Sequence, residues 1–173
     1  MQNKKWKSLL WGVGLIILLD QITKYAVVHF FRLGSVYPVI PYFLDLVHYR
    51  NAGAAFGMLS QWNSSARHFF FIGISGVAIG ILGYYLYKTP IEKKGVYFSL
   101  ILILSGALSN LIDRMIRGNV VDFILFHWYD KVAHFQFLGR SYAFELAWPA
   151  FNVADSAITL GVIFLFMATL RDS

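Results

Sequence analysis

Two aspartates in apolar surroundings are the residues of this sequence best suited to hydrolytic chemistry. Asp122 lies within "VVDF" (residues 120–123), and Asp155 lies within "FNVADSA" (151–157), at the head of the last apolar segment. Two carboxyl groups that share a site do not both ionise readily, so one of them keeps its proton. The ionised partner can deprotonate a water molecule, and the protonated partner can polarise a peptide carbonyl. The pair is therefore a candidate for aspartic peptide hydrolysis.

A purely structural role is the alternative for both aspartates, which would then pair with Lys24, Arg114 or Arg117. Other chemistries have weaker support from the sequence. The five histidines show no HExxH or other metal-ligand spacing, and the chain contains no cysteine. Ser109 and Ser156 lack the sequence context of a serine nucleophile. We therefore expect no metal site.

The elements that must hold these residues are membrane spans. The chain has 173 residues, of which 58% are hydrophobic and 14% charged, and its mean hydropathy is +0.58. This composition is typical of a polytopic membrane protein. Because most lysines flank apolar runs, the net charge of +6 does not indicate nucleic-acid binding. The apolar runs predict four transmembrane helices, at about residues 8–31, 68–87, 95–115 and 150–170.

Two features of these runs have alternative interpretations. A cleaved signal peptide is the alternative for the first run, but no small-residue cleavage site follows it. Gly76 and Gly80, like Ala157 and Gly161, have the small-xxx-small spacing that permits close helix packing. The ordinary glycine content of membrane helices explains the same spacing equally well.

Basic residues predict the orientation of the spans. They concentrate before the first span, between the second and third, and after the fourth. These residues are Lys4, Lys5, Lys7, Lys88, Lys93, Lys94 and Arg171. The positive-inside rule then places both termini and the 88–94 connection in the cytoplasm. The two opposite loops also carry basic residues, but they are longer and influence topology less.

The two long loops predict structure at the outer membrane face. Residues 35–59 are rich in β-branched and aromatic residues, so they predict a cradle of short strands. Residues 119–148 predict strand or interfacial structure, with tryptophans at the water boundary. The expected fold is thus a membrane all-α protein with a small β element, formed as one domain over residues 1–173.

Polar side chains from three spans share one depth. At about 1.5 Å of rise per residue, Asp20, Lys24, Asn110 and Asp155 lie about 20 to 26 Å above the cytoplasmic flanks. The hydrocarbon core is about 30 Å thick, so this layer lies near its outer boundary. Asp122 follows the third span through a Gly-Asn turn and can reach the layer from above. Ionisable groups at this depth usually face a bundle interior or a water-filled cavity.

Helical spacing also gives these polar residues common faces. On the third span, one side carries Gly106, Asn110, Asp113, Arg114 and Arg117. On the fourth span, one side carries Asn152, Asp155, Ser156 and Thr159. A small proton- or ion-coupled transporter is the alternative function for such intramembrane acids. A transporter should distribute its acids through the membrane depth, whereas the cytoplasmic halves of these spans are uniformly apolar.

Five sequence blocks, in one order over nearly the whole chain, resemble the bacterial lipoprotein signal peptidases (signal peptidase II). They are "DQITK" (20–24), "NAGAAF" (51–56), "GALSNLIDR" (106–114), "VVDF" (120–123) and "FNVADS" (151–156). The resemblance implies a four-helix inner-membrane aspartyl peptidase with an extracytoplasmic β-cradle between the first two helices. The stretch between "VVDF" and "FNVADS" is longer than in many members.

The resemblance also implies residue roles and a substrate. Carried over by motif, the catalytic aspartates are Asp122 and Asp155. The residues expected to shape or support the site are Asp20, Lys24, Asn51, Gly106, Asn110, Arg114 and Asn152. The implied substrate is a prolipoprotein with a diacylglyceryl-modified cysteine, cut on the amino-terminal side of that cysteine. The expected enzyme is a monomer in contact with membrane lipid, without metal, organic cofactor or nucleic acid, and its site faces the outer leaflet.

Overall fold

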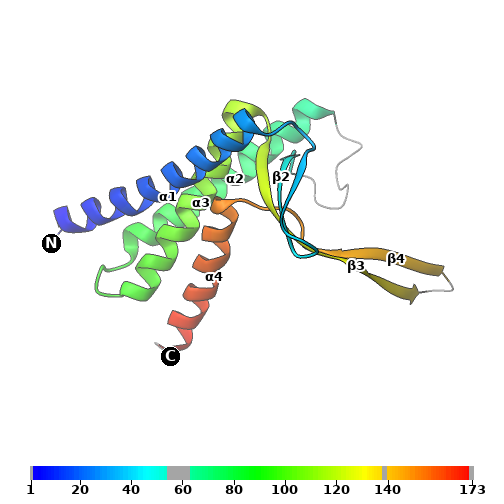
Figure 1. Ribbon diagram of the computed structural model, residues 1–173. Coiled ribbons are helices and arrows are strands. Elements are labelled where there is room, and N and C mark those ends of the chain that lie inside the picture. The colour runs from blue at the N-terminus through cyan, green and yellow to red at the C-terminus, as the bar shows by residue number, and fades with distance from the viewer. Residues whose placement is uncertain (1, 54–62, 138–139, 172–173) are drawn as a thin grey trace.

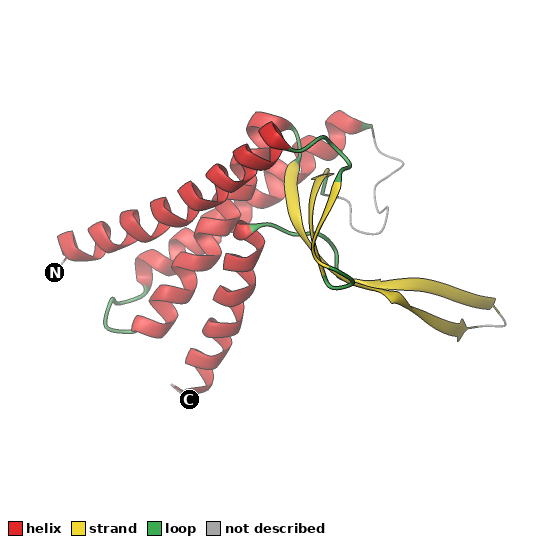
Figure 2. Cartoon of the chain, in the orientation of Figure 1, coloured by secondary structure: helices red, strands yellow, loops and turns green. Residues whose placement is uncertain are grey.

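The computed structural model describes residues 2–53, 63–137 and 140–171. Over these ranges the chain forms four helices and four strands. In chain order they are α1 (Gln2–Phe30), β1 (Val36–Ile40), β2 (Leu44–Asn51), α2 (Ser64–Lys88), α3 (Lys94–Arg117), β3 (Val120–Phe137), β4 (Arg140–Ala147) and α4 (Val153–Arg171). Figures 1 and 2 show that both termini and the α2–α3 connection lie at one end of the helix bundle, and that the strands lie at the other.

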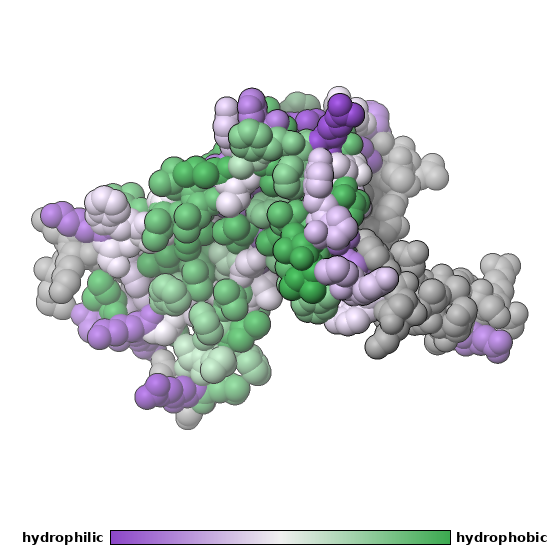
Figure 3. Space-filling view, viewed as in Figure 1, coloured by the Kyte–Doolittle hydropathy of each residue, from purple (hydrophilic) through white to green (hydrophobic). Residues whose placement is uncertain are grey.

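Each of the four helices is long and apolar enough to cross a membrane, which confirms the predicted spans. Large apolar side chains are exposed on the outside of the bundle, as at Leu10 and Trp11. Figure 3 shows hydrophobic residues over the middle of the bundle and hydrophilic ones near its ends. An apolar surface of this kind suits contact with lipid, because the hydrocarbon core replaces water as the solvent.

The helices begin earlier or later than predicted where local chemistry decides the first turn. α1 begins at Gln2, not at residue 8, because lysine is a good helix former and continues the helix through the basic start. α2 begins at Ser64, not at residue 68, because the side-chain oxygen of Asn63 accepts a hydrogen bond from the Ala66 N–H at 2.7 Å. Such N-cap bonds satisfy one of the donors that the first helical turn leaves free.

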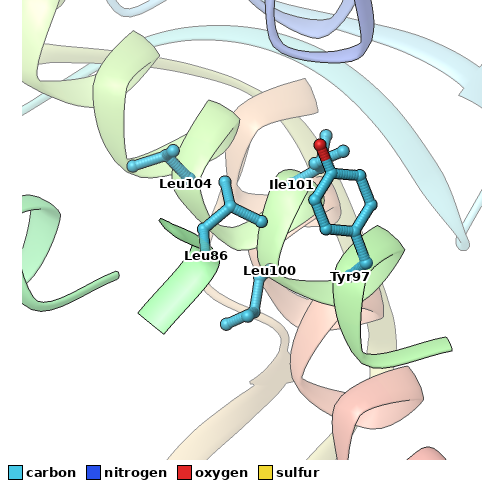
Figure 4. Close-up of a cluster of buried hydrophobic side chains, with 5 residues drawn as sticks. All are labelled: Leu86, Tyr97, Leu100, Ile101 and Leu104. Carbon is cyan, nitrogen blue, oxygen red and sulfur yellow. The ribbon is translucent and has the colours of Figure 1, made fainter. Parts of the chain in front are cut away.

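α3 is the central helix of the bundle. It packs against each of the other three helices, and it carries the largest share of buried residues. An apolar cluster lies where α3 packs against α1 and α2, and Figure 4 shows its buried side chains. They are Leu86 from α2 and Tyr97, Leu100, Ile101 and Leu104 from α3. Residues projecting from α3 can therefore meet groups from α1 and α4 in the interior.

Two glycines allow α3 and α4 to approach closely. A β-carbon at Gly106 would overlap the carbonyl oxygen of Ala154, and one at Gly161 would lie 2.6 Å from Ile103 Cγ1. The predicted close packing at Gly161 is thus confirmed. The same prediction is wrong for Gly76 and Gly80, since a β-carbon at either position would meet no described atom within 4 Å. Those glycines face outward, so their spacing reflects ordinary glycine content.

Replacing Gly106 by alanine should therefore destabilise the bundle, whereas Gly76→Ala should not. The added methyl group meets backbone in the first case, so α3 and α4 must separate, at a cost of about 1 to 3 kcal/mol. In the second case the methyl group meets open space, and alanine favours the helix by about 0.5 to 1 kcal/mol. Melting temperatures of the two variants in detergent micelles measure the contrast. Equal melting temperatures would contradict the close approach.

The strands form an antiparallel sheet in the order β1-β2-β3-β4. β1 and β2 confirm the predicted cradle over residues 36–51, while residues 54–59 of that prediction lie outside the described residues. β3 and β4 confirm strand structure within 119–148, and they extend the cradle beyond the segment between α1 and α2. The cradle therefore combines two segments that are distant in the sequence.

A glycine turn brings β3 back against the end of the helix bundle that is opposite the chain termini. Gly118 ends α3 in the left-handed conformation (φ 77°), and its N–H donates to the Arg114 carbonyl at 3.1 Å. Glycine adopts this conformation without the steric cost that a β-carbon adds. β3 starts at Val120, so Asp122 lies within the first residues after the turn.

Candidate active site

Asp122 is held on β3 by two amide side chains. Its Oδ1 accepts a hydrogen bond from Asn152 Nδ2 at 2.8 Å, and its Oδ2 accepts one from Asn51 Nδ2 at 3.1 Å. Asn51 comes from β2, the strand paired with β3. The strand itself is fixed to α3, because the Val121 N–H donates to Asp113 Oδ2 at 3.2 Å. The Asp122 carboxylate is therefore buried and oriented from both sides.

Asp155 belongs to the cap of α4. The side-chain oxygen of Asn152 accepts a hydrogen bond from the Asp155 N–H at 2.9 Å, and Asp155 Oδ2 accepts one from the Asn152 N–H at 3.3 Å. This reciprocal arrangement has the geometry of a capping box, with aspartate in place of glutamate. It explains why α4 begins at Val153 instead of residue 150. The second carboxylate oxygen, Oδ1, accepts from Asn110 Nδ2 at 2.8 Å.

Asn152 connects the two aspartates. Its oxygen caps Asp155, while its Nδ2 donates to Asp122 Oδ1 and to the Val121 carbonyl, the latter at 3.2 Å. Its side chain is fully buried, so water does not compete for these bonds. One amide group thus fixes the positions of both carboxyl groups relative to each other.

Neither aspartate of this pair forms an ion pair with a described lysine, arginine or histidine. The structural alternative, in which they pair with Lys24, Arg114 or Arg117, is therefore wrong. Lys24 and Arg117 pair with other acids, and Arg114 Nη1 donates to the Asn110 carbonyl at 3.2 Å. Amide donors position a carboxylate without neutralising it, which leaves Asp122 and Asp155 available for proton transfer.

A buried charge network lies beside the pair. Lys24 Nζ contacts Asp20 Oδ2 at 2.8 Å, Asp113 Oδ2 at 2.9 Å and Asn110 Oδ1 at 2.9 Å. Lys24 and both acids are fully buried, so each charge depends on its partners. Because Lys24 binds the oxygen of the Asn110 amide, the nitrogen of that amide faces Asp155. Lys24 therefore orients the Asn110 amide that donates a hydrogen bond to Asp155.

Asp20 ties three helices together at this level. Its Oδ1 accepts from the Ala154 N–H of α4 at 2.8 Å, and its Oδ2 accepts from Ser109 Oγ of α3 at 2.6 Å. Asp20 itself belongs to α1. The predicted polar layer of three spans is thus confirmed by direct contacts.

Four residues of this network were not among the predicted site residues. Gln21 Nε2 donates to Ser109 Oγ at 3.0 Å and to Asp113 Oδ1 at 3.2 Å, and Arg117 pairs with the same Asp113 carboxylate. Helical spacing had placed Asp113 on the polar side of the third span, and this pattern was sufficient to predict it as a site residue. Gln21 and Ser109 had no comparable signal, because neutral side chains in an apolar helix are common.

Two other residues that were predicted to support the site do not touch the carboxyl groups. Gly106 allows α3 to approach α4 closely at Ala154, which is the residue next to Asp155. The Arg114 guanidinium lies 5.9 Å from the centre of the Phe71 ring. Within the described ranges it donates no hydrogen bond to either aspartate.

The pKa of Asp122 is raised from 3.8 to about 6. Burial is the main cause, and the negative charge of Asp155 adds to it, while the hydrogen bonds from Asn51 and Asn152 act in the opposite direction. A carboxyl group with this pKa stays protonated to a much higher pH than an ordinary aspartate does, which suits a general acid.

This shift predicts how Asp122→Asn changes stability with pH. A raised folded-state pKa stabilises the fold fully below pH 3.8, and that contribution is lost as the pH rises through about 6. The variant lacks the titrating group, so its stability relative to the parent should rise by about 3 kcal/mol from acidic to neutral pH. Melting temperatures at pH 4.5 and 7.5, with Glu92→Gln as a control, measure the effect. A pH-independent difference would contradict the shift.

An apolar groove of about 630 Å³ opens beside Asp155. Aromatic residues of the sheet and the β4–α4 connection form one wall, and α4 forms the other. The lining residues are Phe43, Phe126, Trp128, Trp148, Phe151, Asp155, Ser156, Thr159 and Leu160. The groove thus joins a carboxyl group to a surface suited to an apolar ligand.

Comparisons with known proteins agree with this geometry. The family model for signal peptidase (SPase) II matches residues 13–171. The lipoprotein signal peptidase of Syntrophotalea carbinolica is 39% identical over 99% of this chain and 96% of its own length. That of Halalkalibacterium halodurans is 41% identical over 91% of this chain and 88% of its own length. Neither the family match nor these relatives support the transporter alternative.

Two solved structures of bacterial membrane enzymes share the fold. One is 31% identical with a TM-score of 0.72, and the similarity covers 96% of this chain and 89% of that one. The other is 29% identical with a TM-score of 0.71 and covers 96% and 95% of the two chains.

Proposed function

The chain belongs to the signal peptidase II family, and on that premise we propose that Asp122 and Asp155 are its catalytic dyad. The activity is the removal of signal peptides from prolipoproteins, which is peptide-bond hydrolysis. The observation that carries the dyad assignment is the Asn152 side chain, which holds both carboxyl groups within one buried hydrogen-bonded unit.

In this proposal the two carboxyl groups divide the work of proton transfer. Asp122, with its pKa raised to about 6, starts protonated and donates a hydrogen bond to the scissile carbonyl oxygen. Asp155 starts ionised and accepts a proton from a water molecule, whose oxygen attacks the carbonyl carbon. The proton of Asp122 passes to the carbonyl oxygen, which gives a neutral tetrahedral diol.

The second half of the reaction returns the protons. Asp155 gives its proton to the amide nitrogen, and the carbon–nitrogen bond breaks to release a free amine. Asp122 takes back a proton from one hydroxyl group as the new carboxyl group forms. The starting protonation state is restored, so no further group is needed for turnover.

We propose that the substrate presents a diacylglyceryl-modified cysteine, with cleavage on its amino-terminal side. The apolar groove supports this choice, because it contains Asp155 and also an aromatic wall that suits acyl chains or apolar residues next to the scissile bond. Asp155 therefore belongs both to the lining of the groove and to the proposed dyad.

We further propose that the site faces the outer leaflet of the bacterial inner membrane, in a monomer. Lysines at the opposite end of the bundle, including Lys7 and Lys94, support a cytoplasmic position for both termini. The residues that position the dyad all come from one chain, so the site is complete in a single copy. They are Asn51, Asn110 and Asn152.

Purified protein in lipid vesicles tests the substrate proposal. It should cleave a precursor that carries the diacylglyceryl-modified cysteine, and it should leave the same precursor without the lipid largely uncut. Mass spectrometry of the products identifies the new amino terminus, which should be the modified cysteine. Equal cleavage of both precursors would overturn the lipid requirement while leaving the dyad assignment intact.

A further inference from the structure

The Asn51 amide is held in one orientation between a backbone group and Asp122. Its side-chain oxygen accepts a hydrogen bond from the Gly53 N–H at 2.8 Å, and its Nδ2 donates to Asp122 Oδ2 at 3.1 Å. Because a backbone N–H can only donate, the oxygen must face Gly53, and the nitrogen is then left for Asp122. The turn at Gly53 therefore decides whether Asn51 offers a donor or an acceptor to the carboxyl group.

This turn needs support from elsewhere in the fold. Asn51 is the last residue of β2 and is exposed, so water competes for its hydrogen bonds, and a single bond of this kind contributes little net stability. Gly53 has φ 90°, a conformation that glycine adopts readily but that also leaves this stretch of backbone many alternatives. Local chemistry alone therefore does not keep the Asn51 amide in place.

The ring of Phe71 packs directly against the turn. A β-carbon at Gly53 would lie 2.6 to 2.8 Å from three atoms of this ring, whereas carbon atoms in ordinary contact are about 3.5 to 4.0 Å apart. Phe71 belongs to α2, so this contact joins the end of β2 to the helix bundle. The ring limits movement of the Gly53 backbone toward α2, and thereby limits rotation of the Asn51 amide.

The same ring is anchored on α3 by Arg114. The central carbon of the Arg114 guanidinium lies 5.9 Å from the centre of the Phe71 ring, within the distance of about 6 Å at which an aromatic face attracts a cation. The guanidinium is fixed in turn, because its Nη1 donates to the Asn110 carbonyl at 3.2 Å. Phe71 thus connects the turn that orients Asn51 to the helix that carries Asn110.

Phe71 is separate from the groove that opens beside Asp155. The described residues that line this groove come from the sheet, the β4–α4 connection and α4, and Phe71 is not among them. A change at Phe71 should therefore alter the geometry of the carboxyl groups and leave the apolar contacts of a substrate in the groove intact.

We propose that Phe71 is a positioning residue for the Asp122–Asp155 dyad, because its ring holds the Asn51–Gly53 turn and so keeps the Asn51 nitrogen on Asp122. The inference rests on the proposed function, since it concerns the orientation of one of the two proposed catalytic groups. Without the ring the amide can rotate, and Asp122 keeps only the hydrogen bond from Asn152. The expected loss is about 10-fold in kcat, which is the effect of one hydrogen bond.

Phe71→Leu tests the proposal, with Phe69→Leu as the matched control. Leucine stays apolar but removes the flat ring, and Phe69 lies on the same helix with 70% of its surface exposed. Steady-state cleavage of a lipidated precursor in detergent micelles should show a kcat about 10-fold lower for Phe71→Leu, with KM unchanged. Phe69→Leu should keep both constants, and Phe71→Tyr, which retains the ring, should keep most of the parental kcat.

The same substitution in an Asn51→Ala background shows whether Phe71 acts through Asn51. Asn51→Ala should lower kcat by itself, and Phe71→Leu should then add no further loss, because the amide that the ring positions is already absent. Phe71→Met repeats the comparison with an unbranched side chain, and melting temperatures establish that each variant is folded.

Three results would overturn the proposal. They are an unchanged kcat in Phe71→Leu, a raised KM with kcat unchanged, and losses that multiply in the double variant. The last result would show that the ring stabilises the bundle in general and does not act through Asn51. Failure of the dyad assignment gives a different result, since Asp122→Asn would then cleave at a near-parental rate whatever residue occupies position 71.

Discussion

Replacing either Asp122 or Asp155 by asparagine should slow cleavage of a lipidated precursor by about 10³-fold or more. Asparagine keeps the size of aspartate, and its single side-chain oxygen can still accept one of the two hydrogen bonds, but it cannot act as an acid or a base at neutral pH. Loss of Asp155 removes the group that takes the proton of the water, and loss of Asp122 removes the group that protonates the carbonyl oxygen. Single-turnover release of the signal peptide in detergent micelles measures both rates.

The controls for this experiment separate chemistry from folding. Glu92→Gln changes an acid in the α2–α3 connection, at the other end of the bundle, and should leave cleavage unchanged. Each asparagine variant should still unfold cooperatively on heating in the same detergent, which shows that it is folded. Near-parental cleavage by either well-folded variant would rule out the dyad.

Replacing Lys24 by methionine should destabilise the protein by about 3 to 5 kcal/mol. Methionine fills much of the same space but leaves the buried carboxylates of Asp20 and Asp113 without their shared cation. For a chain of this size the loss corresponds to a melting temperature lower by on the order of 10 °C. Cleavage should also fall, since the Asn110 amide loses the partner that aims its nitrogen at Asp155.

A double-mutant cycle isolates the ion pair from the loss of packing. Asp113→Asn removes one carboxylate, and it should cost less in a Lys24→Met background than in the parent. The difference between the two costs is the coupling energy of the pair. Additive effects would show that Lys24 and Asp113 do not depend on each other, which the 2.9 Å contact contradicts.

Much of the polar layer was predictable because helices convert spacing into position. A fixed rise per residue placed Asp20, Lys24, Asn110 and Asp155 at one depth, and the structure brings these four into one connected network. The reciprocal cap between Asn152 and Asp155 was also visible in principle. An Asn-x-x-Asp sequence just before an apolar run has the spacing of a capping box.

The rest depended on contacts that no local pattern contains. The groove combines Phe43, Trp128 and Leu160, which come from three separate parts of the chain. The β3–β4 register could not be derived either, because the irregularity between Trp128 and Val132 shifts the alternation on one strand alone. Gly76 and Gly161 illustrate the same limit, since equal spacing gave an open surface at one and a helix contact at the other.

The separation of the Asp122 and Asp155 carboxyl groups tests the central claim most directly. An experimental structure, with a peptide-like transition-state mimic in the groove, would give the distance between their nearest oxygens. We predict that one water or hydroxyl oxygen lies within hydrogen-bond distance of both groups, so that the carboxyl oxygens are at most about 6 Å apart. Carboxyl groups too far apart for one oxygen to contact both, with the mimic bound elsewhere, would contradict the account.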